Sequence, residues 1–263
     1  MIALVTGASS GIGAEFARQL AARKYDLILV ARRRQRLDDL AARLATEHGI
    51  RAEALAADLT VEAELGAVEA RIARDGGVDL LVNNAGFGVP GYFWETAVDA
   101  QEALHRLHIQ ATMRLTHASL AGMTARNSGA VVNVSSVAAF MAAAVSSTYG
   151  ATKTWINAFT EGLYLELKSK RSAVRVQALC PGFTYSEFHD VIGMDRRVIP
   201  GPMWLRAEDV VAASLAGLER GKLFVVPGWR YKLIVALVPA LPRAIRNPVI
   251  LAYSSRRGAG QKH

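Results

Sequence analysis

Tyr149 and Lys153 are the residues of this chain whose types and spacing best suit proton transfer. They lie four residues apart in the stretch Ser-Ser-Thr-Tyr-Gly-Ala-Thr-Lys, residues 146–153. In a helix this spacing places both side chains on one face, one turn apart. A phenol loses its proton near pH ~10, and a neighbouring ammonium lowers that pKa towards neutrality. The pair therefore predicts a proton donor and acceptor, although the same spacing also arises by chance on surface helices.

A glycine-rich turn follows the first apolar run of the chain. Residues 2–6 read Ile-Ala-Leu-Val-Thr, which is typical of a buried parallel strand. Gly7, Gly11 and Gly13 come next, in Gly-Ala-Ser-Ser-Gly-Ile-Gly, and a helical pattern covers residues 14–23. Glycines let a backbone approach a pyrophosphate, and a helix N-terminus favours an anion. This context predicts a dinucleotide-binding loop, and the alternative is a purely structural turn.

Arginines follow the second expected strand, residues 26–31. NAD-dependent enzymes usually carry an acidic residue at this place, which binds the ribose hydroxyls. Arg32 and Arg33 instead suit a 2′-phosphate, because a guanidinium can bind phosphate through two parallel hydrogen bonds. The sequence therefore favours NADP(H) as cofactor over NAD(H). Arg34 is expected to be a solvated first residue of a helix at 34–48.

Strands and helices alternate along most of the chain. Further strands are expected at 51–57, 79–83, 130–135, 174–179 and 223–226, and further helices at 61–74, 97–126 and 149–170. This order predicts an α/β fold with a single Rossmann-type, doubly wound parallel sheet of about seven strands flanked by helices. We expect residues 1–228 to form one NADP-binding catalytic domain and residues 229–263 to form a basic, apolar C-terminal extension.

The composition is that of a protein with a packed core, since 51% of the 263 residues are hydrophobic and 21% are charged. The single cysteine, Cys180, excludes an intrachain disulfide and suits a reducing compartment, where it is expected to be a buried filler. The N-terminus lacks the pattern of a signal peptide, and no uncharged apolar run approaches ~20 residues. We therefore expect a soluble, cytoplasmic protein.

The net charge of +8 belongs to the C-terminal segment, because nine basic residues and no acidic one follow Glu219. Apolar runs at 233–242 and 247–252 alternate with these charges. Such a segment could lie on an anionic membrane surface. It could also cover a pocket and attract an acidic acyl carrier or coenzyme A, or pack on a sister subunit. Nucleic acid is not expected as a partner, because no recognition motif accompanies the charge.

Four motifs stand in a fixed order along the chain. They are Thr-Gly-Ala-Ser-Ser-Gly-Ile-Gly at 6–13, Asn-Asn-Ala-Gly at 83–86, Ser136, and Tyr149-x-x-x-Lys153, with Pro181-Gly182 after them. Over residues 1–228 this set resembles the short-chain dehydrogenase/reductase superfamily, and within it the bacterial 3-oxoacyl-reductase and 3-ketoacyl-CoA-reductase-like branch. The resemblance implies hydride transfer between a nicotinamide and a small-molecule carbonyl or alcohol. It also implies a homodimer or homotetramer that pairs the helices at 97–126 and 149–170.

The resemblance assigns roles to individual positions. It implies that Tyr149 is the acid/base, that Lys153 binds the nicotinamide ribose and lowers the tyrosine pKa, and that Ser136 hydrogen-bonds the substrate oxygen. The resemblance also implies a set of cofactor-binding residues, which adds to Arg32 and Arg33 described above. They are Gly7, Ser9, Ser10, Gly11, Ile12 and Gly13 in the glycine loop, Asp58 and Leu59 at the adenine, Asn84, Ala85 and Gly86 beside the riboses, and Pro181, Gly182, Thr184 and Ser186 near the carboxamide and diphosphate.

The expected pocket walls are mostly apolar, which suits a lipid-like, aromatic or steroid-like carbonyl. They are Phe87, Val89, Phe93, Val137, Phe140, Phe183, Phe188, Met203 and Trp204. For each of these residues the alternative is ordinary core packing. Residues 183–205 are expected to form a mobile substrate loop, as in relatives.

His108 is the one departure from the family pattern. It stands where the family usually has an asparagine that holds a water relaying protons to the lysine. A histidine can shuttle protons, or its ring can simply pack. We predict slower turnover and an imidazole-like ionisation in the pH profile. A weakly catalytic NADP-binding scaffold or sensor is the rival function. No metal is expected, because His105, His108 and His117 are too few ligands for a zinc site.

Overall fold

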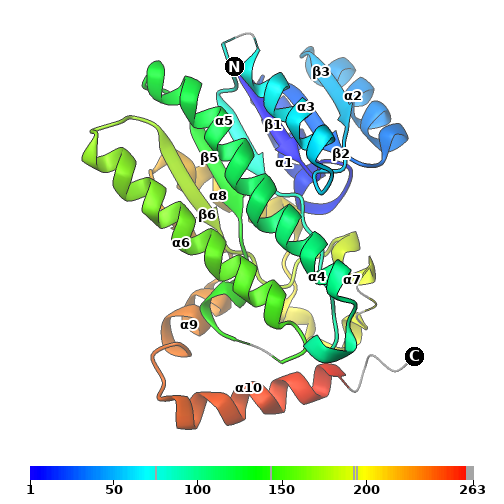
Figure 1. The fold of residues 1–263 in the computed structure, drawn as a ribbon, viewed down its shortest axis with the longest axis vertical. Helices are drawn as coiled ribbons and strands as arrows, with labels where there is room; N and C mark the ends of the chain where they lie inside the picture. The colour runs from blue at the N-terminus through cyan, green and yellow to red at the C-terminus, as the bar shows by residue number, and fades with distance from the viewer. Residues whose placement is uncertain (75, 143, 192, 194, 259–263) are drawn as a thin grey trace.

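A central parallel sheet organises the molecule. The computed structural model describes residues 1–74, 76–142, 144–191, 193 and 195–258. Seven strands, all parallel, pair in the order β3-β2-β1-β4-β5-β6-β7 (Figure 1). They are β1 (Ile2–Thr6), β2 (Asp26–Ala31), β3 (Ala52–Ala56), β4 (Leu80–Asn83), β5 (Ala130–Val134), β6 (Arg175–Leu179) and β7 (Phe224–Val225). The predicted doubly wound α/β fold is confirmed. The strand order reverses between β1 and β4, where sheets of this kind open a ligand crevice.

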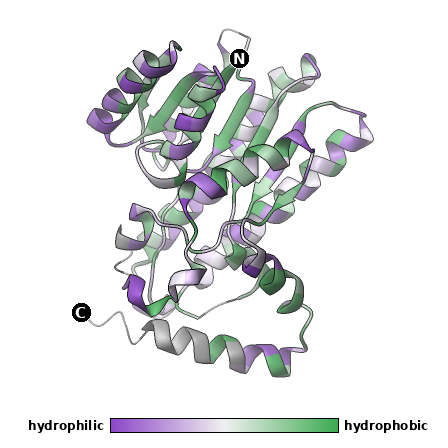
Figure 2. Ribbon diagram, turned by 180° about the vertical axis from the view of Figure 1, so that it is seen from behind, coloured by the Kyte–Doolittle hydropathy of each residue, from purple (hydrophilic) through white to green (hydrophobic). Residues whose placement is uncertain are grey.

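Helices bury both faces of the sheet. The first hydrophobic core lies under α1 (Gly11–Ala22), α2 (Arg34–His48) and α8 (Ala207–Glu219), and the second under α3 (Glu62–Ala73), α5 (Thr112–Ala125) and α6 (Ser147–Ser169). Side chains alternate along a strand, so Val5 joins the first core and Leu4 the second. Strands buried on both faces read as continuous apolar runs, as the sequence does here. Figure 2 shows the hydrophobic strands inside and the hydrophilic outer side of α2.

The predicted helix at 97–126 contains an irregular turn. It divides into α4 (Val98–His105), a π-helical segment η2 (Arg106–Ala111) and α5. A π-helical turn bonds residue i to i+5 and so holds one residue more than an α-helical turn. His108 lies in η2 and is buried. The pattern of apolar residues in the sequence did not predict this π-helical turn.

The segment after β6 has its own small core. It contains α7 (Glu187–Val191) and the short 3-10 turns η4 (Arg196–Val198) and η5 (Gly201–Met203). Ile199 and Trp204 are buried together, with Phe183 and Met203 packed against them. Thr184 pairs with Leu205 in an isolated parallel bridge, which joins the two ends of the segment. This segment, residues 183–205, is called the substrate segment below.

Two helices, α9 (Trp229–Leu237) and α10 (Arg243–Gly258), make up the end of the described chain. The Tyr231 side chain is buried, and its hydroxyl accepts from the Phe183 N–H (3.0 Å) and donates to the Met203 carbonyl (2.7 Å). The first turn of the predicted extension is thus anchored to the substrate segment. None of the described helices combines the length and the apolar character that a membrane crossing requires.

Candidate active site

The predicted site residues come together because they follow the carboxyl ends of parallel strands. The glycine loop follows β1, Arg33 follows β2, and Asn84 follows β4. Ser136 follows β5, and Pro181 with Gly182 follows β6. Carboxyl ends of parallel strands meet at one edge of the sheet, so five short segments distant in sequence border one crevice.

The glycine loop is held in place by the end of β4. Gly7 and Gly11 have φ of 64° and 54°, the left-handed region that glycine tolerates best. The Asn84 side-chain amide donates to the carbonyls of Thr6 (2.9 Å) and Gly7 (3.3 Å). A Cβ on Gly13 would lie 2.3 Å from the Gly7 carbonyl oxygen, so a larger residue would force the loop open.

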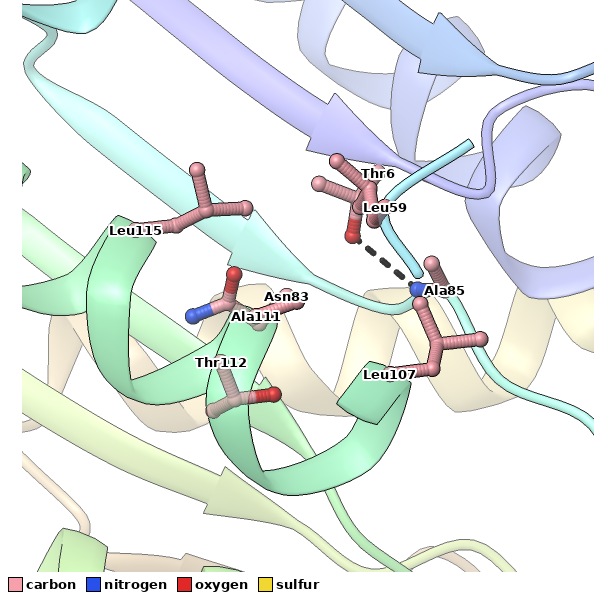
Figure 3. Close-up of a pocket in the computed structure, with 8 residues that line it drawn as sticks. All are labelled: Thr6, Leu59, Asn83, Ala85, Leu107, Ala111, Thr112 and Leu115. Carbon is pink, nitrogen blue, oxygen red and sulfur yellow. Dashed lines mark hydrogen bonds between the residues drawn. The ribbon is translucent and has the colours of Figure 1, made fainter. Parts of the chain in front are cut away.

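Thr6 links β1 to the Asn-Asn-Ala-Gly turn. Its Oγ1 accepts from the backbone N–H groups of Asn84 (2.9 Å) and Ala85 (3.0 Å), and it donates to the Val82 carbonyl (3.3 Å). Figure 3 shows the Ala85 bond at the rim of a small recess. The recess is lined by Thr6, Leu59, Asn83, Ala85, Leu107, Ala111, Thr112 and Leu115 (Figure 3).

The two arginines after β2 occupy different surroundings. Arg33 extends over the glycine loop and donates to the hydroxyl oxygens of Ser9 (2.9 Å) and Ser10 (2.9 Å). Arg32 is largely exposed, with one guanidinium nitrogen 3.8 Å from an Asp58 carboxylate oxygen. Both guanidinium groups therefore border the place where β2 ends, with Arg33 the closer to the loop.

Lys153 is buried beneath the site. Its Nζ donates to the Val134 carbonyl (2.8 Å) and lies 5.7 Å from the centre of the Tyr149 ring. Burial lowers the pKa of Lys153 to about 8. Burial likewise raises the pKa of the neighbouring Cys180 thiol to about 12, which suits the inert filler expected from the sequence. A buried ammonium that can still give up its proton near neutrality is typical of catalytic sites.

Tyr149 and Ser136 come from two elements packed on one another. Tyr149 lies in the first turn of α6. The Ser136 hydroxyl oxygen accepts from the Ala138 N–H (3.1 Å) and so begins the 3-10 turn η3 (Val137–Phe140). The Thr154 hydroxyl of α6 donates to the Ala139 carbonyl of that turn (2.9 Å). The Tyr149 ring contacts the rings of His108 and Phe188, with centroid distances of 5.7 and 5.9 Å.

His108 is held as a neutral ring. Its Nε2 accepts from the Phe87 N–H (3.3 Å), so the proton resides on Nδ1, which faces the Thr152 hydroxyl (2.9 Å). Thr152 in turn donates to the Tyr149 carbonyl (2.9 Å). Burial, with smaller contributions from Lys153 and His105, lowers the pKa of His108 well below its usual value. The buried ring therefore carries no charge at neutral pH, which argues against the imidazole-like ionisation expected in the pH profile.

The predicted pocket walls divide into four groups. Phe188 and Phe87 contact the rings of Tyr149 and His108, respectively. Phe183, Met203 and Trp204 pack within the core of the substrate segment. Phe140 contacts Phe224 of β7 (6.3 Å). Val89 and Val137 are half-buried, and Phe93 is exposed beside a cavity of about 360 Å³ that Thr148 also lines.

Four site residues were missed by the sequence reasoning: Thr6, Thr152, Glu187 and Tyr231. Thr152 lies three residues after Tyr149, so helical periodicity could have placed it on the same face. Glu187, an acid in an aromatic stretch, was a visible signal. Tyr231 lies 49 residues after Gly182 in the sequence and gave no local signal.

Comparison with known proteins agrees with this geometry. The profile of the family described as short chain dehydrogenase matches residues 1–196. An uncharacterized oxidoreductase of Staphylococcus epidermidis is 34% identical over 69% of this chain and 76% of its own length. A very-long-chain 3-oxoacyl-CoA reductase of Laccaria bicolor is 33% identical over 65% of this chain and 52% of its own length. The predicted resemblance to the 3-oxoacyl-reductase-like branch is confirmed.

Solved structures extend the similarity over nearly the whole chain. A short-chain dehydrogenase from Sphingobium yanoikuyae in complex with NADPH is 38% identical, with 94% of each chain covered and a TM-score of 0.84. A bulky-bulky ketone specific alcohol dehydrogenase from Comamonas testosteroni is 32% identical, with 100% of this chain and 94% of that chain covered and a TM-score of 0.77. From its motifs, its fold and these relatives, the chain belongs to the short-chain dehydrogenase/reductase family of oxidoreductases.

Proposed function

We propose that this chain is an NADP(H)-dependent reductase that interconverts a bulky, apolar ketone and its secondary alcohol. One observation carries the proposal: the Tyr149 ring stands 5.7 Å from the buried Lys153 ammonium, and their helix α6 packs on the turn η3 that Ser136 begins after β5. A phenol, an ammonium and a hydroxyl in such a crevice can protonate a carbonyl oxygen and stabilise its charge.

The residues present fit a nicotinamide dinucleotide. Gly7 and Gly11 adopt left-handed conformations at the start of α1, where backbone N–H groups favour a pyrophosphate. Arg33, Ser9 and Ser10 together supply guanidinium and hydroxyl groups suited to a 2′-phosphate. The NADPH complex of the Sphingobium relative supports the same preference. We assign the remaining cofactor roles to the positions given by the motifs, with Asp58 and Leu59 at the adenine and Thr184 and Ser186 near the diphosphate.

The chain's own residues then handle the proton. When bound, the nicotinamide supplies the hydride in reduction and accepts it in oxidation. In reduction, the Tyr149 hydroxyl gives its proton to the substrate oxygen, while the Ser136 hydroxyl donates a hydrogen bond to that oxygen. The Lys153 ammonium then stabilises the phenolate that remains on Tyr149. A positioned acid of this kind contributes about 10²–10⁴-fold to the rate.

His108 supports this arrangement as a neutral group. Its ring connects the Phe87 backbone to Thr152, and Thr152 connects it to the Tyr149 carbonyl. We propose that His108 fixes the first turn of α6 and that any proton relay through it passes along the neutral Nδ1–H and Thr152 hydroxyl. Gly86 leaves the room this ring needs, since a Cβ there would lie 2.8 Å from His108 Nε2.

The substrate class follows from the surroundings of Tyr149. Phe87 and Phe188 place aromatic rings near the reacting hydroxyl. Apolar walls with few polar groups favour a substrate with large hydrophobic substituents. The bulky-ketone specificity of the Comamonas relative and the acyl-chain substrate named for the Laccaria relative support the same class.

The C-terminal helices present an apolar surface that a partner could cover. Trp229, Leu233 and Leu237 recur every four residues along α9 and are each at least half exposed. Arg230 and Lys232 lie among them. We propose that this surface meets either a sister subunit of a homodimer or homotetramer or an anionic membrane surface.

The test of the proposed function is NADPH oxidation with a panel of ketones that differ in the size of both substituents. We expect turnover with bulky apolar ketones, its loss in Tyr149→Phe, and its retention in the control Tyr164→Phe, a half-buried tyrosine further along α6. NADPH binding without turnover of any ketone would instead support the scaffold or sensor function. Unchanged turnover in Tyr149→Phe would refute the mechanism.

A further inference from the structure

Glu187 joins two parts of the crevice that lie far apart in sequence. It is the first residue of α7, in the substrate segment that follows β6. Its carboxylate accepts from Arg33 (2.7 Å) at the end of β2 and from Arg36 (2.6 Å) in α2. Each carboxylate oxygen has its own guanidinium partner, Oε2 with Arg33 and Oε1 with Arg36.

The substrate segment thereby lies directly over the glycine loop. A Cβ built on Gly11 would be 2.9 Å from the Cβ of Ser186, the residue before Glu187. The Arg33 guanidinium contacts three groups at this point, the hydroxyls of Ser9 and Ser10 and the Glu187 carboxylate. The glycine loop, the end of β2 and the substrate segment therefore share one guanidinium.

Glu187 is a bound anion in electrostatic terms. The hydrogen bonds from Arg33 and Arg36 lower the pKa of the Glu187 carboxyl to about 2, so it stays ionised at every pH of interest. A carboxylate that accepts from two guanidinium groups resembles a phosphate in its negative charge and in the arrangement of the donors around it. Single exposed ion pairs contribute little to stability, but a carboxylate shared between two arginines is a small network.

We propose that Glu187 occupies the 2′-phosphate site of the crevice and competes with the phosphate of NADP(H) for Arg33. This inference rests on the proposed use of NADP(H). A 2′-phosphate that takes the guanidinium of Arg33 must displace the Glu187 carboxylate, whose release frees the start of α7 from the rim of the loop. NADH has no 2′-phosphate and leaves the Glu187 contacts in place. Glu187 is thus a residue that limits cofactor selectivity and joins cofactor choice to the position of the substrate segment.

The size of the effect follows from the competition. The apparent affinity for NADPH equals the intrinsic affinity multiplied by the fraction of molecules in which Arg33 is available to the phosphate. If Glu187 holds Arg33 in about nine molecules of ten, removing the carboxylate strengthens NADPH binding about tenfold. Binding of NADH should change less than about twofold, because its ribose hydroxyl does not require Arg33 to leave Glu187.

The experiment measures dissociation constants of NADPH and NADH by fluorescence titration for the full chain, Glu187→Gln and the control Asp195→Asn. Asp195 lies in the same segment and pairs with Arg197, so its variant removes one charge without touching Arg33. We expect the NADH-to-NADPH ratio of dissociation constants to rise about tenfold in Glu187→Gln only. In an Arg33→Gln background the same change at Glu187 should alter NADPH binding less than about twofold, because the contested group is gone.

An unchanged or smaller ratio in Glu187→Gln overturns the inference, as does an equal weakening of both cofactors, which would mean that Glu187 merely holds the crevice closed. Neither outcome bears on whether the unmodified chain reduces ketones. Failure of the proposed function is detected in a different assay, as the absence of Tyr149-dependent NADPH oxidation.

Discussion

Replacing Lys153 with methionine should stabilise the cofactor-free protein at neutral pH. The lysine pKa falls from 10.5 in water to about 8 in the fold, because burial penalises the charged amine. One pKa unit corresponds to ~1.36 kcal/mol, so keeping this ammonium buried costs about 3 kcal/mol at pH 7. Methionine has a similar length and no charge, and its variant escapes that cost while losing the hydrogen bond to the Val134 carbonyl.

The difference in unfolding free energy between Lys153→Met and wild type should change with pH, and this change isolates its electrostatic part. Between pH 8 and 10.5 the unfolded chain binds the lysine proton more strongly than the fold does, so the wild-type protein gains stability relative to the variant as the pH rises. The cost that remains at pH 9.5 is about 1 kcal/mol, and the advantage of Lys153→Met should therefore shrink by about 2 kcal/mol between pH 7 and 9.5. Packing changes and the lost Val134 bond do not depend on pH and cancel in this comparison.

The assay is urea unfolding of both proteins at the two pH values and at one protein concentration. Lys170→Met is the control, since Lys170 is exposed just after α6 and its charge is solvated in both states. A difference between Lys153→Met and wild type that stays constant with pH would refute the buried-ammonium argument. An advantage of Lys153→Met that grows with pH would have the opposite sign to the predicted change and would refute the argument as well.

Three further predictions concern the supports of the site and the C-terminal surface. Tyr231→Phe should lower the free energy of unfolding by about 1–3 kcal/mol in urea titrations, because the Phe183 N–H and the Met203 carbonyl lose their partner; an unchanged midpoint would contradict the anchoring role. Comparison of wild type with His108→Asn should show no histidine-dependent step in kcat between about pH 5.5 and 7.5, because the buried ring is neutral; a step present only with histidine would contradict this. The full chain should sediment with liposomes rich in anionic lipid more than a Leu233→Gln/Leu237→Gln variant, which removes two exposed apolar side chains of α9 and keeps Tyr231; equal sedimentation with a change in oligomer size would assign the surface to a sister subunit.

The sheet could be predicted from the sequence because its inner strands β1, β2, β4, β5 and β6 are largely buried on both faces. These strands read as mostly apolar runs, and each is followed by a turn whose residue types suit the crevice. The strand expected at 130–135 is observed as Ala130–Val134, and the helix expected at 149–170 as Ser147–Ser169. The motifs were sufficient to place Tyr149 and Lys153 on one helix.

Contacts between distant segments could not be predicted in the same way. The Glu187 pairs with Arg33 and Arg36 span about 150 residues, and no periodic pattern relates them. The lowered pKa of His108 could not be predicted from its residue type, because a histidine ordinarily titrates near neutrality and its burial is a property of the fold. The helix α8 lacked a motif and was not among the predicted elements, although its apolar face completes the first core.

The extra residue that the π-helical turn of η2 holds also determines which face of α5 is turned towards the sheet. An α-helix turns by about 100° per residue, so removing one residue from Arg106–Ala111 would rotate α5 by roughly that angle about its axis. Leu115 and Met123, which now face the sheet, would swing sideways, and polar neighbours would take their places. The π-helical turn that places the His108 ring at the crevice thus also aligns α5 with the second core. The length of η2 is therefore constrained both by the site and by the packing of α5.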